Sequence, residues 1–375
     1  MTAMVSAEWV KEQGRAVGFD RVGIAPAAEL PELALFPDWL ERGYAGAMDY
    51  LHNPKRRDVR ELFPDARSVI CGALIYDTEQ PRSTEVPPDR ARGWLSRYAW
   101  GDDYHTIVEE KLEALRARVA ERAGNGFQCK LYVDTGPVLE RVYARHAGLG
   151  WQGKNTCLLD AELGSFFFLG VLVTNLELAP DTPLADACGA CTLCLEACPT
   201  GALVEPYVMD ARRCLSYLTI ELRDAIPDEF RPAVGRHVFG CDICQDVCPY
   251  NRRAALTRLS AFAPREIETR SSKSETRERR AAGHESPVTS HQSLFHPCLD
   301  WLVSLTEEDF KQIFRTSAVK RARWRGLVRN ALVAMGNSGD ARFRPALEQL
   351  AASPDPLLAE HAKWALAQLA VRTKG

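Results

Sequence analysis

Eight cysteines between residues 188 and 248 are the residues whose type and spacing most clearly indicate chemistry. They form the run C-x2-C-x2-C-x3-C-P, a single cysteine, and the shorter run C-x2-C-x3-C-P. The first run has the iron–sulfur spacing of bacterial ferredoxins, in which three thiolates bind one cubane and the fourth binds a second. The sequence therefore predicts two 4Fe–4S clusters on Cys188, Cys191, Cys194, Cys198, Cys214, Cys241, Cys244 and Cys248.

The same spacing predicts how the cysteines divide between the two clusters. Three closely spaced cysteines reach one cubane, and a cysteine that precedes proline points toward the other. One cluster is therefore expected on Cys188, Cys191, Cys194 and Cys248. The second run is one cysteine short of a full repeat, so the other cluster is expected on Cys198, Cys214, Cys241 and Cys244.

Zinc and disulfides are the competing uses of these cysteines. Zinc takes four thiolates, but its usual knuckles are paired C-x2-C units rather than a triple run closed by C-P. Disulfides need an oxidising compartment, for which no other feature of the sequence argues. The spacing thus favours clusters, and the other cysteines, Cys71, Cys129, Cys157 and Cys298, are expected to be buried free thiols.

The composition bounds the class of protein. The 375 residues suggest two or three domains, and 46% hydrophobic and 26% charged residues are typical of a globular protein. A net charge of −3 argues against a uniformly basic nucleic-acid binder but leaves room for a local basic face. No stretch reaches the ~20 apolar residues of a membrane span, and no export signal is recognised at the amino terminus. A cytoplasmic protein without membrane contact is expected.

Helices and strands alternate in the predicted elements of residues 1–180, which is typical of an α/β domain. The expected strands are 19–24, 66–75, 128–133 and 164–176, and the expected helices are 6–17, 39–51, 106–123 and 138–147. Residues 148–155 match G-x-G-x-x-G by letter, but no helix is expected after them, so they are interpreted as a loop.

The whole chain is expected to be an α+β protein in four parts. Residues 1–180 form the α/β domain, and residues 181–262 form a ferredoxin-like two-cluster domain. Residues 263–297 are charged and poor in apolar side chains, which predicts a linker. Residues 298–375 contain helical patterns at 327–335, 342–352 and 355–369, which fit a small HEAT-like all-α domain or an ordinary helical bundle.

Asp134 is the candidate acid. It lies where a predicted strand meets a predicted helix, beside Thr135 and Gly136. In an apolar pocket its carboxyl would have a raised pKa and could donate a proton. The structural alternative is a helix cap or an Asx turn, which is the commoner use of aspartate at such a position.

Two groups of basic residues are candidates for binding anionic or amide-rich ligands. Arg57, Arg97, Arg141 and Lys154 lie in the amino-terminal half, where each alone would be an ordinary surface charge. Residues 311–329 carry seven cations and no acid, which predicts contact with phosphates or one solvated helix face. Trp324 within this run would stack on a base or pack against the protein.

Taken together, the motifs resemble the epoxyqueuosine reductase family over nearly the whole chain. The resemblance rests on the eight cysteines and on five further stretches, each of which is modest alone. Their order and spacing together are specific. The stretches are Ser96–His105, Val133–Arg141, Ala147–Asn155, Cys214–Glu221 and Lys320–Ala331.

The resemblance implies a reaction and its cofactors. The family removes the epoxide oxygen of epoxyqueuosine at the wobble position of tRNA, using cobalamin and two 4Fe–4S clusters. Asp134 would be the proton donor. The residues implied around the cobalamin are Arg57, Arg97, Asp134, Arg141, Lys154, Asn155, Leu158 and Ser216. The D-x-H-x-x-G motif is absent, so no protein histidine is expected on cobalt.

The resemblance also implies partners. The HEAT-like domain would hold the tRNA anticodon stem-loop, with the basic side chains of Lys320, Arg321, Arg323 and Arg325 on its phosphates. An external donor such as flavodoxin or ferredoxin would supply electrons to a monomeric enzyme. The segment 266–292 is longer and more charged than expected between the cluster and helical domains, and its role stays open.

Two alternatives compete with this interpretation. A reductive dehalogenase shares corrinoid and cluster chemistry, but those enzymes are usually exported through a twin-arginine signal, which is not found here. A non-catalytic electron carrier with a helical docking domain would bind neither cobalamin nor tRNA. Salt-dependent binding of tRNA would distinguish these alternatives, because phosphate contacts release counterions.

Overall fold

The computed structural model describes residues 5–270 and 289–372. They form two compact units, and each is described by itself. The first unit comprises residues 1–86, 103–218 and 242–260, and the second comprises 87–102, 219–241 and 261–375. These units do not coincide with the predicted segments 1–180, 181–262, 263–297 and 298–375, since residues 219–241 of the predicted cluster segment belong to the second unit. Among the described residues, no helix combines the length and apolar character needed to cross a bilayer.

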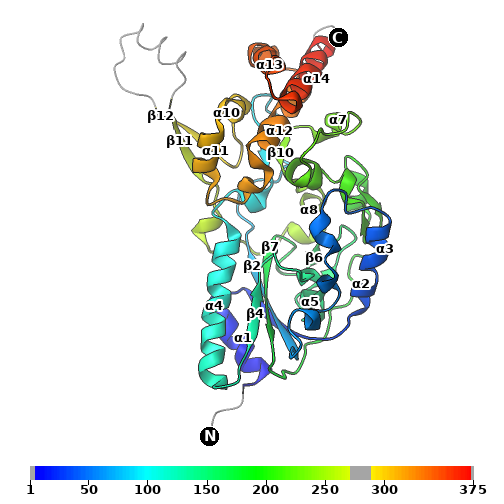
Figure 1. The fold of residues 1–375 in the computed structure, drawn as a ribbon, viewed down its shortest axis with the longest axis vertical. Helices are drawn as coiled ribbons and strands as arrows, with labels where there is room; N and C mark the ends of the chain where they lie inside the picture. The colour runs from blue at the N-terminus through cyan, green and yellow to red at the C-terminus, as the bar shows by residue number, and fades with distance from the viewer. Residues whose placement is uncertain (1–4, 271–288, 373–375) are drawn as a thin grey trace. The chain divides into compact units, whose positions relative to one another are not determined.

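A four-stranded sheet forms the centre of the first unit (Figure 1). Its order is β1 (Arg21–Pro26), β2 (Ser68–Ile75), β7 (Phe167–Thr174) and β4 (Cys129–Tyr132), and every neighbouring pair is antiparallel. The expected α/β arrangement is therefore corrected to α+β for this unit. Alternation of helices and strands along the chain does not determine strand direction, which depends on how each connection returns to the sheet.

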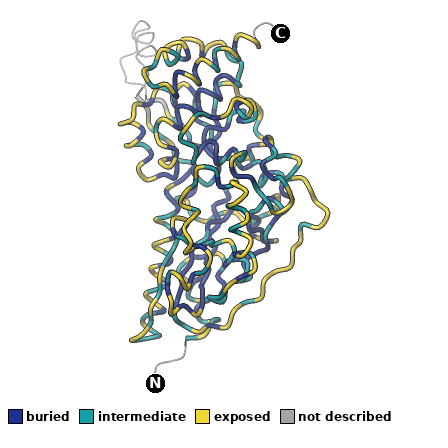
Figure 2. The backbone as a smooth tube through the Cα atoms, turned by 45° about the vertical axis from the view of Figure 1, so that its right-hand side comes forward, coloured by how far each residue is buried: buried dark blue, intermediate teal, exposed yellow. Residues whose placement is uncertain are grey.

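Helices cover both faces of this sheet, which explains why β2 is buried at every position. On one face, Val69 and Val171 belong to the same core as Tyr143 of α5 (Glu140–His146). On the other face, α4 (Tyr104–Ala123) lies so close to β7 that a Cβ on Gly170 would meet Val108 at 2.6 Å. α1 (Ala7–Ala16) packs against β1. Figure 2 shows the buried backbone at the centre and the exposed residues outside.

Helix ends follow the expected signals, with one clear failure. The side chain of Asp103 accepts a hydrogen bond from the backbone N–H of His105 at the start of α4, which ends at Gly124 with a φ of 73°.

The predicted helix 39–51 is wrong. Only α3 (Phe36–Glu41) forms, because Gly43 and Gly46 then take φ of 70° and 58° and turn the chain. α2 (Pro31–Ala34) precedes it, and 3-10 turns follow at Asp49–His52, Pro54–Arg57 and Val59–Glu61.

The cysteine loops of the first unit are held by short elements. These are β5 (Trp151–Gln152) paired with β6 (Leu158–Leu159), α6 (Leu193–Ala197), β8 (Leu203–Glu205) paired with β9 (Val208–Met209), and α8 (Ile243–Asp246). α6 and α8 are in contact. The segment 148–155, predicted to be a loop, thus contains the strand β5, whose Trp151 packs against Cys248.

The second unit is built around the buried helix α12 (Arg323–Ser338). Packed near it are α13 (Arg344–Ala351), α14 (Pro356–Arg372), α10 (Leu299–Ser304), α11 (Glu307–Phe314) and α7 (Arg231–Val234). β3 (Trp94–Leu95) pairs in parallel with β10 (His237–Phe239). In the predicted linker, β11 (Glu266–Arg270) pairs with β12 (Thr289–Ser293), so its two ends form a strand pair. Residues 271–288 of that linker lie outside the described residues.

Candidate functional site

Asp134 lies two residues after the end of β4, on the turn toward α5. Its φ is 56°, a left-handed conformation that aspartate tolerates better than most residues. Its side chain is 68% exposed. The N-cap of α5 is Leu139, so Asp134 does not cap this helix. The structure therefore places an exposed carboxylate where the sequence suggested either an acid or a cap.

Two residues of α4 bind the Asp134 carboxylate. The Tyr104 hydroxyl donates to Asp134 Oδ2 at 2.9 Å, and His105 Nε2 lies 3.6 Å from the same oxygen. On its other side, His105 Nδ1 lies 2.7 Å from Asp103 Oδ1. The Tyr104 ring stacks on Phe168 and on His105, each at 4.1 Å between ring centroids. The Tyr104 and His105 contacts were missed from the sequence, although the motif Ser96–His105 contains both residues.

The electrostatics of this group correct the expected direction of the Asp134 pKa. Desolvation acts to raise it, but the nearby His105 ring and the hydrogen bond from Tyr104 hold the pKa of Asp134 below its usual value. Desolvation acts to lower the pKa of His105, but the carboxylates of Asp103 and Asp134 raise it to about 9. At neutral pH the structure therefore has an Asp134 carboxylate beside a His105 imidazolium.

Glu140 is a second titratable group beside this site. It is the first residue of α5, and its Oε1 is buried without a hydrogen-bond partner among the described residues. Burial raises the pKa of Glu140 to about 7, and the nearby Asp134 carboxylate adds to the shift. This residue was given no role from the sequence, although the motif Val133–Arg141 contains it, because a glutamate in the first turn of a helix is ordinary.

The predicted cobalamin residues do not all lie in similar surroundings. Arg57 and Arg141 are exposed in the first unit, and Arg141 Nη1 donates to the Thr156 carbonyl at 3.2 Å. Leu158 is buried in β6. Arg97 lies in the second unit, 2% exposed, with its guanidinium 4.5 Å from the Trp100 ring.

Three other predicted cobalamin residues, Lys154, Asn155 and Ser216, contact cysteine loops. Lys154 Nζ donates to the carbonyls of Gly189 and Cys191 at 2.6 and 2.9 Å. Asn155 is 3% exposed and donates to the Cys244 carbonyl at 3.2 Å. Burial raises the pKa of the Cys214 thiol, and the backbone N–H groups of Ser216 and Tyr217 oppose this shift. The structure thus places Lys154, Asn155 and Ser216 at the predicted cluster ligands.

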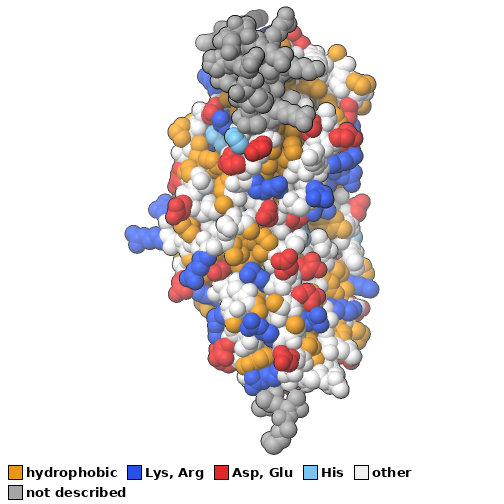
Figure 3. Space-filling model, turned by 90° about the vertical axis from the view of Figure 1, so that its left-hand side faces the viewer, with side chains coloured by type: hydrophobic (Ala, Val, Ile, Leu, Met, Phe, Trp, Pro, Cys, Tyr) orange, Lys and Arg blue, Asp and Glu red, His pale blue; other side chains and the backbone are white. Residues whose placement is uncertain are grey.

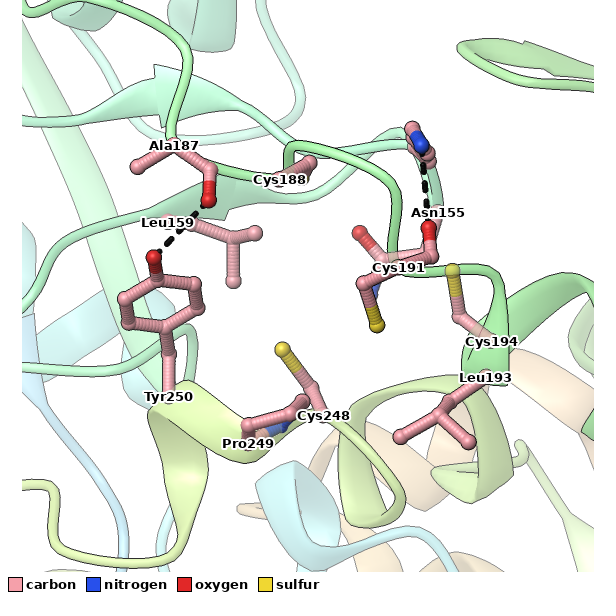
Figure 4. A pocket seen from close by; sticks show the side chains of 11 residues that line it. Asn155, Leu159, Ala187, Cys188, Cys191, Leu193, Cys194, Cys248, Pro249 and Tyr250 are labelled. Carbon is pink, nitrogen blue, oxygen red and sulfur yellow. Dashed lines mark hydrogen bonds between the residues drawn. The ribbon is translucent and has the colours of Figure 1, made fainter.

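The four cysteines predicted to share the first cluster line one cavity of about 200 Å³. Cys194 is on α6, Cys188 and Cys191 precede this helix, and Cys248 follows α8. Figure 4 shows the sulfur atoms of Cys191, Cys194 and Cys248 around the same space, with Leu159 and Tyr250 beside it. Tyr250 donates to the Ala187 carbonyl at 2.9 Å, which ties Cys248 to the Cys188 loop.

This donor set fits a 4Fe–4S cubane, which takes four thiolates. All the cysteines are free thiols. Among the described residues, no three His, Cys, Asp or Glu side chains are grouped so as to hold a metal ion. A cubane spreads its ligands over four iron atoms, so its thiolates need not converge on one point.

Three of the four cysteines predicted for the second cluster, Cys198, Cys214 and Cys244, belong to the first unit. Cys241 belongs to the second unit. Cys157, expected to be a buried free thiol, is only half-buried, as are Cys129 and Cys298, whereas Cys71 is buried. A hydrogen bond with the Cys244 thiol lowers the pKa of Cys157 to about 7, against the effect of burial.

The predicted tRNA-binding cations lie where a 3-10 turn (Ala318–Ala322) meets α12 in the second unit. Lys320, Arg321, Arg323 and Arg325 are all exposed. Arg321 forms two hydrogen bonds with Glu221, at 2.8 and 2.9 Å, and Arg325 forms two with Asp355, at 2.6 and 2.8 Å. On the face in Figure 3, acidic and basic side chains are interspersed, in line with the small net charge.

Two residues of the basic run serve the core instead. Arg329 is fully buried and donates to the carbonyls of Leu222 and Asp224 at 2.9 and 2.6 Å. The Trp324 indole N–H donates to the Leu305 carbonyl at 2.7 Å. This bond ties the half-buried Trp324 to the protein, as expected of the packing role.

Comparisons with known proteins agree with both parts of the site. Residues 187–251 match the family described as 4Fe-4S double cluster binding domain. Residues 56–135 match the family described as Epoxyqueuosine reductase QueG, DUF1730. An epoxyqueuosine reductase from Gloeobacter violaceus is 42% identical over 346 residues, covering 90% of this chain and 98% of the relative. The Escherichia coli epoxyqueuosine reductase is 37% identical and covers 96% of this chain and 89% of the relative.

Solved structures extend this similarity to the fold. A crystal structure of a selenomethionine-labelled epoxyqueuosine reductase has a TM-score of 0.82 at 30% identity, covering 96% of this chain and 90% of that one. Another, with a tRNA-Tyr epoxyqueuosine-modified stem loop, has a TM-score of 0.81 at 30% identity, covering 96% and 89%. A Bacillus subtilis enzyme, with a TM-score of 0.80 at 30% identity over 96% and 90% of the chains, has its aspartate catalytic loop swung out of the active site.

The double-cluster domain and the α+β fold define an iron–sulfur oxidoreductase with carboxy-terminal helices. Identity of about 40% over nearly the full length of the relatives then defines the particular family. The chain belongs to the epoxyqueuosine reductase family. This membership decides against the reductive dehalogenase and the non-catalytic electron carrier.

Proposed function

We propose that this enzyme reduces epoxyqueuosine to queuosine at the wobble position of tRNA, with Asp134 as the proton donor. The observation that carries the proposal is the exposed Asp134 carboxylate, bound by Tyr104 and His105 in the unit that also holds the four-cysteine cavity. Oxygen removal needs both electrons and protons at one place. A cluster on the four thiols would supply the electrons. The Asp134 carboxylate, paired with the acid His105, would supply the protons.

Two 4Fe–4S clusters would be held by the cysteine groups predicted from the spacing. The first group lines one cavity, and the Lys154 ammonium lies on the backbone carbonyls of its loop. A positive charge there favours the reduced, more negative cluster. An external donor such as flavodoxin or ferredoxin would deliver single electrons to these clusters.

Cobalamin is the cofactor proposed to receive these electrons, and when bound it supplies a cobalt that can react with an epoxide carbon. Its corrin ring carries amide side chains, for which arginine donors are suitable partners. Arg57 and Arg141 are exposed in the first unit and fit this role. Lys154 and Asn155 bond to cysteine loops, so any role of theirs toward cobalamin would add to the cluster contacts.

Asp134 would protonate the epoxide oxygen as its bond to carbon breaks, which avoids a free alkoxide. The Tyr104 hydroxyl orients the carboxyl, and the stack of His105, Tyr104 and Phe168 holds both partners in place. Substrate binding would cover the exposed carboxylate and exclude water. Desolvation disfavours the charged form, so the covered Asp134 would bind a proton more readily than in the free enzyme.

The carboxy-terminal helices, as a HEAT-like domain, would bind the anticodon stem-loop. A structurally similar epoxyqueuosine reductase was solved with such a stem loop. Lys320, Arg321, Arg323 and Arg325 would contact phosphates, and for this Arg321 and Arg325 would have to exchange Glu221 and Asp355 for phosphate oxygens. We also propose that the cluster segment is ferredoxin-like. The enzyme would be a monomer in the cytoplasm.

One anaerobic assay tests the proposal. Protein with reconstituted clusters and added cobalamin is given a chemical reductant and tRNA that carries epoxyqueuosine, and the digested nucleosides are weighed by mass spectrometry. We expect loss of one oxygen atom, no loss without cobalamin, and a decrease of about 100-fold or more in Asp134→Ala. Glu113→Ala, on the exposed surface of α4, is the matched control. Unchanged tRNA, with clusters and cobalamin bound, would refute the proposed reaction.

A further inference from the structure

The balance of the proposed reaction calls for two protons at one oxygen atom. An epoxide takes two electrons and two protons to give an alkene and water, as both carbon–oxygen bonds break and a carbon–carbon π bond forms. The external donor supplies the electrons through the clusters. Asp134 carries one proton at a time, so it must be protonated again before the oxygen leaves as water.

His105 is placed to supply these protons. Its Nε2 lies 3.6 Å from Asp134 Oδ2, and this nitrogen is buried without a closer hydrogen-bond partner among the described residues. Its Nδ1 lies 2.7 Å from Asp103 Oδ1, a carboxylate that is 7% exposed. A carboxylate on Nδ1 stabilises the imidazolium and directs the Nε2 proton at Asp134. The His105 side chain as a whole is 29% exposed, which places solvent beside the ring that has to be recharged.

We propose that Asp103, His105 and Asp134 form a proton relay in which His105 protonates Asp134 for each of the two transfers to the substrate oxygen. In the first transfer, His105 protonates Asp134, and this proton goes to the epoxide oxygen as one carbon–oxygen bond breaks and leaves a hydroxyl. Solvent recharges His105, which then protonates Asp134 a second time. In the second transfer, Asp134 protonates this hydroxyl, which departs as water when the other bond breaks. After the second transfer, solvent recharges His105 again. This relay rests on the proposed function, the reduction of epoxyqueuosine.

Neighbouring groups are less suited to this role. The Tyr104 hydroxyl also touches Asp134, but an ordinary phenol, with a pKa of about 10, is a poor proton source at neutral pH. Glu140 is half-buried, and its Oε1 atom is buried without a hydrogen-bond partner in the described chain. The charges that act on His105 are the carboxylates of Asp103 and Asp134. The positive charge of Arg141 acts on Asp134 and lowers its pKa.

The relay is tested by the pH dependence of a single turnover of epoxyqueuosine-tRNA under anaerobic conditions. In wild-type enzyme we expect a rate that is constant near neutral pH and falls as pH approaches about 9, when the His105 proton is lost. His105→Gln should be slower by about 100-fold at neutral pH and recover toward pH 5, where solvent protonates Asp134 directly. Asp103→Asn should move the fall in rate to lower pH, since the imidazolium loses a partner.

The controls separate a relay from a structural role. His146→Gln replaces another histidine that lies beside a carboxylate, with Nε2 2.8 Å from Glu32, and should keep the wild-type profile. The cluster EPR spectrum of each variant reports that it is assembled. His105→Gln and Asp103→Asn with wild-type pH profiles would overturn the relay and leave the proposed function standing. A wild-type enzyme that turns over no epoxyqueuosine would refute the function itself. If His105→Gln does not assemble, Asp103→Asn alone decides.

Discussion

At the scale of single residues, the chemistry of Asp134 depends on contacts that its own sequence position does not reveal. The carboxylate is exposed, yet it shares one oxygen with the Tyr104 hydroxyl and the His105 ring. These donors favour the ionised form, so in the free enzyme Asp134 is a carboxylate rather than a ready acid. Proton donation therefore depends on His105 and on the removal of water by a bound substrate.

The raised pKa of His105 can be measured directly. A proton NMR titration should place the pKa of His105 well above that of a free imidazole, near the value of about 9, and lower it in Asp103→Asn. Because the folded-state pKa is raised, the stability that this charge contributes is complete below the unfolded value of about 6.5 and lost as pH rises through about 9. A His105 resonance that titrates near 6.5 in the folded enzyme would contradict the assigned contacts.

The cysteines also differ residue by residue. Cys248→Ser should remove one cluster and lower the bound iron by about half, because Cys248 lines the first cavity. Cys157→Ser is the matched control, since Cys157 lies against Cys244 but is not one of the eight predicted ligands. Iron and acid-labile sulfide analysis checks both variants. Equal losses in the two variants would mean that the ligand assignment is wrong.

At the scale of elements, two glycines on α12 show that close packing determines how a glycine-to-alanine substitution changes the stability of the second unit. A Cβ on Gly336 would lie 2.8 Å from the Ala365 Cα on α14, whereas a Cβ on Gly326 would meet only the Ala322 Cβ at 3.8 Å. The first glycine permits the contact between the two helices. The second has no such role, and glycine costs a helix about 1 kcal/mol relative to alanine.

The two alanine variants should therefore change stability in opposite directions. Gly336→Ala is expected to destabilise the second unit by about 1–3 kcal/mol, because the backbone of α14 has to move. Gly326→Ala is expected to be neutral or to stabilise it by up to about 1 kcal/mol. Thermal unfolding followed by circular dichroism would give the transition temperatures of the two variants. A lower transition temperature for Gly326→Ala than for Gly336→Ala would contradict the packing of α12.

At the scale of the whole molecule, the basic end of α12 is expected to hold the tRNA by charge. Arg323→Gln should weaken tRNA binding and reduce the slope of log affinity against log salt by somewhat less than about one, the value for one phosphate contact. Lys311→Gln is the control, because Lys311 is paired with Glu307 on α11. Fluorescence anisotropy at several salt concentrations checks the slopes. Equal slopes for wild type and Arg323→Gln would remove Arg323 from the interface.

Much of the molecule could be predicted because its signals are local. The four strands of the sheet and the helices α1, α4, α5 and α14 follow from apolar patterns, caps and glycine stops, which act within a few residues. The failure at 39–51 is also local, because two glycines with positive φ outweigh the apolar pattern. Strand direction and the division into units were not predictable, since they depend on contacts between distant segments.

The cysteine spacing alone determined that this protein is built for iron–sulfur chemistry, because cluster ligands must follow one another at short intervals on a loop. The motif order alone was enough to indicate the family. Only the tertiary structure decided which side chains surround Asp134, which of the basic residues remain exposed and which, like Arg329, are buried. These outcomes depend on pairing across the fold, where burial and partner charges, rather than residue type, determine protonation and exposure.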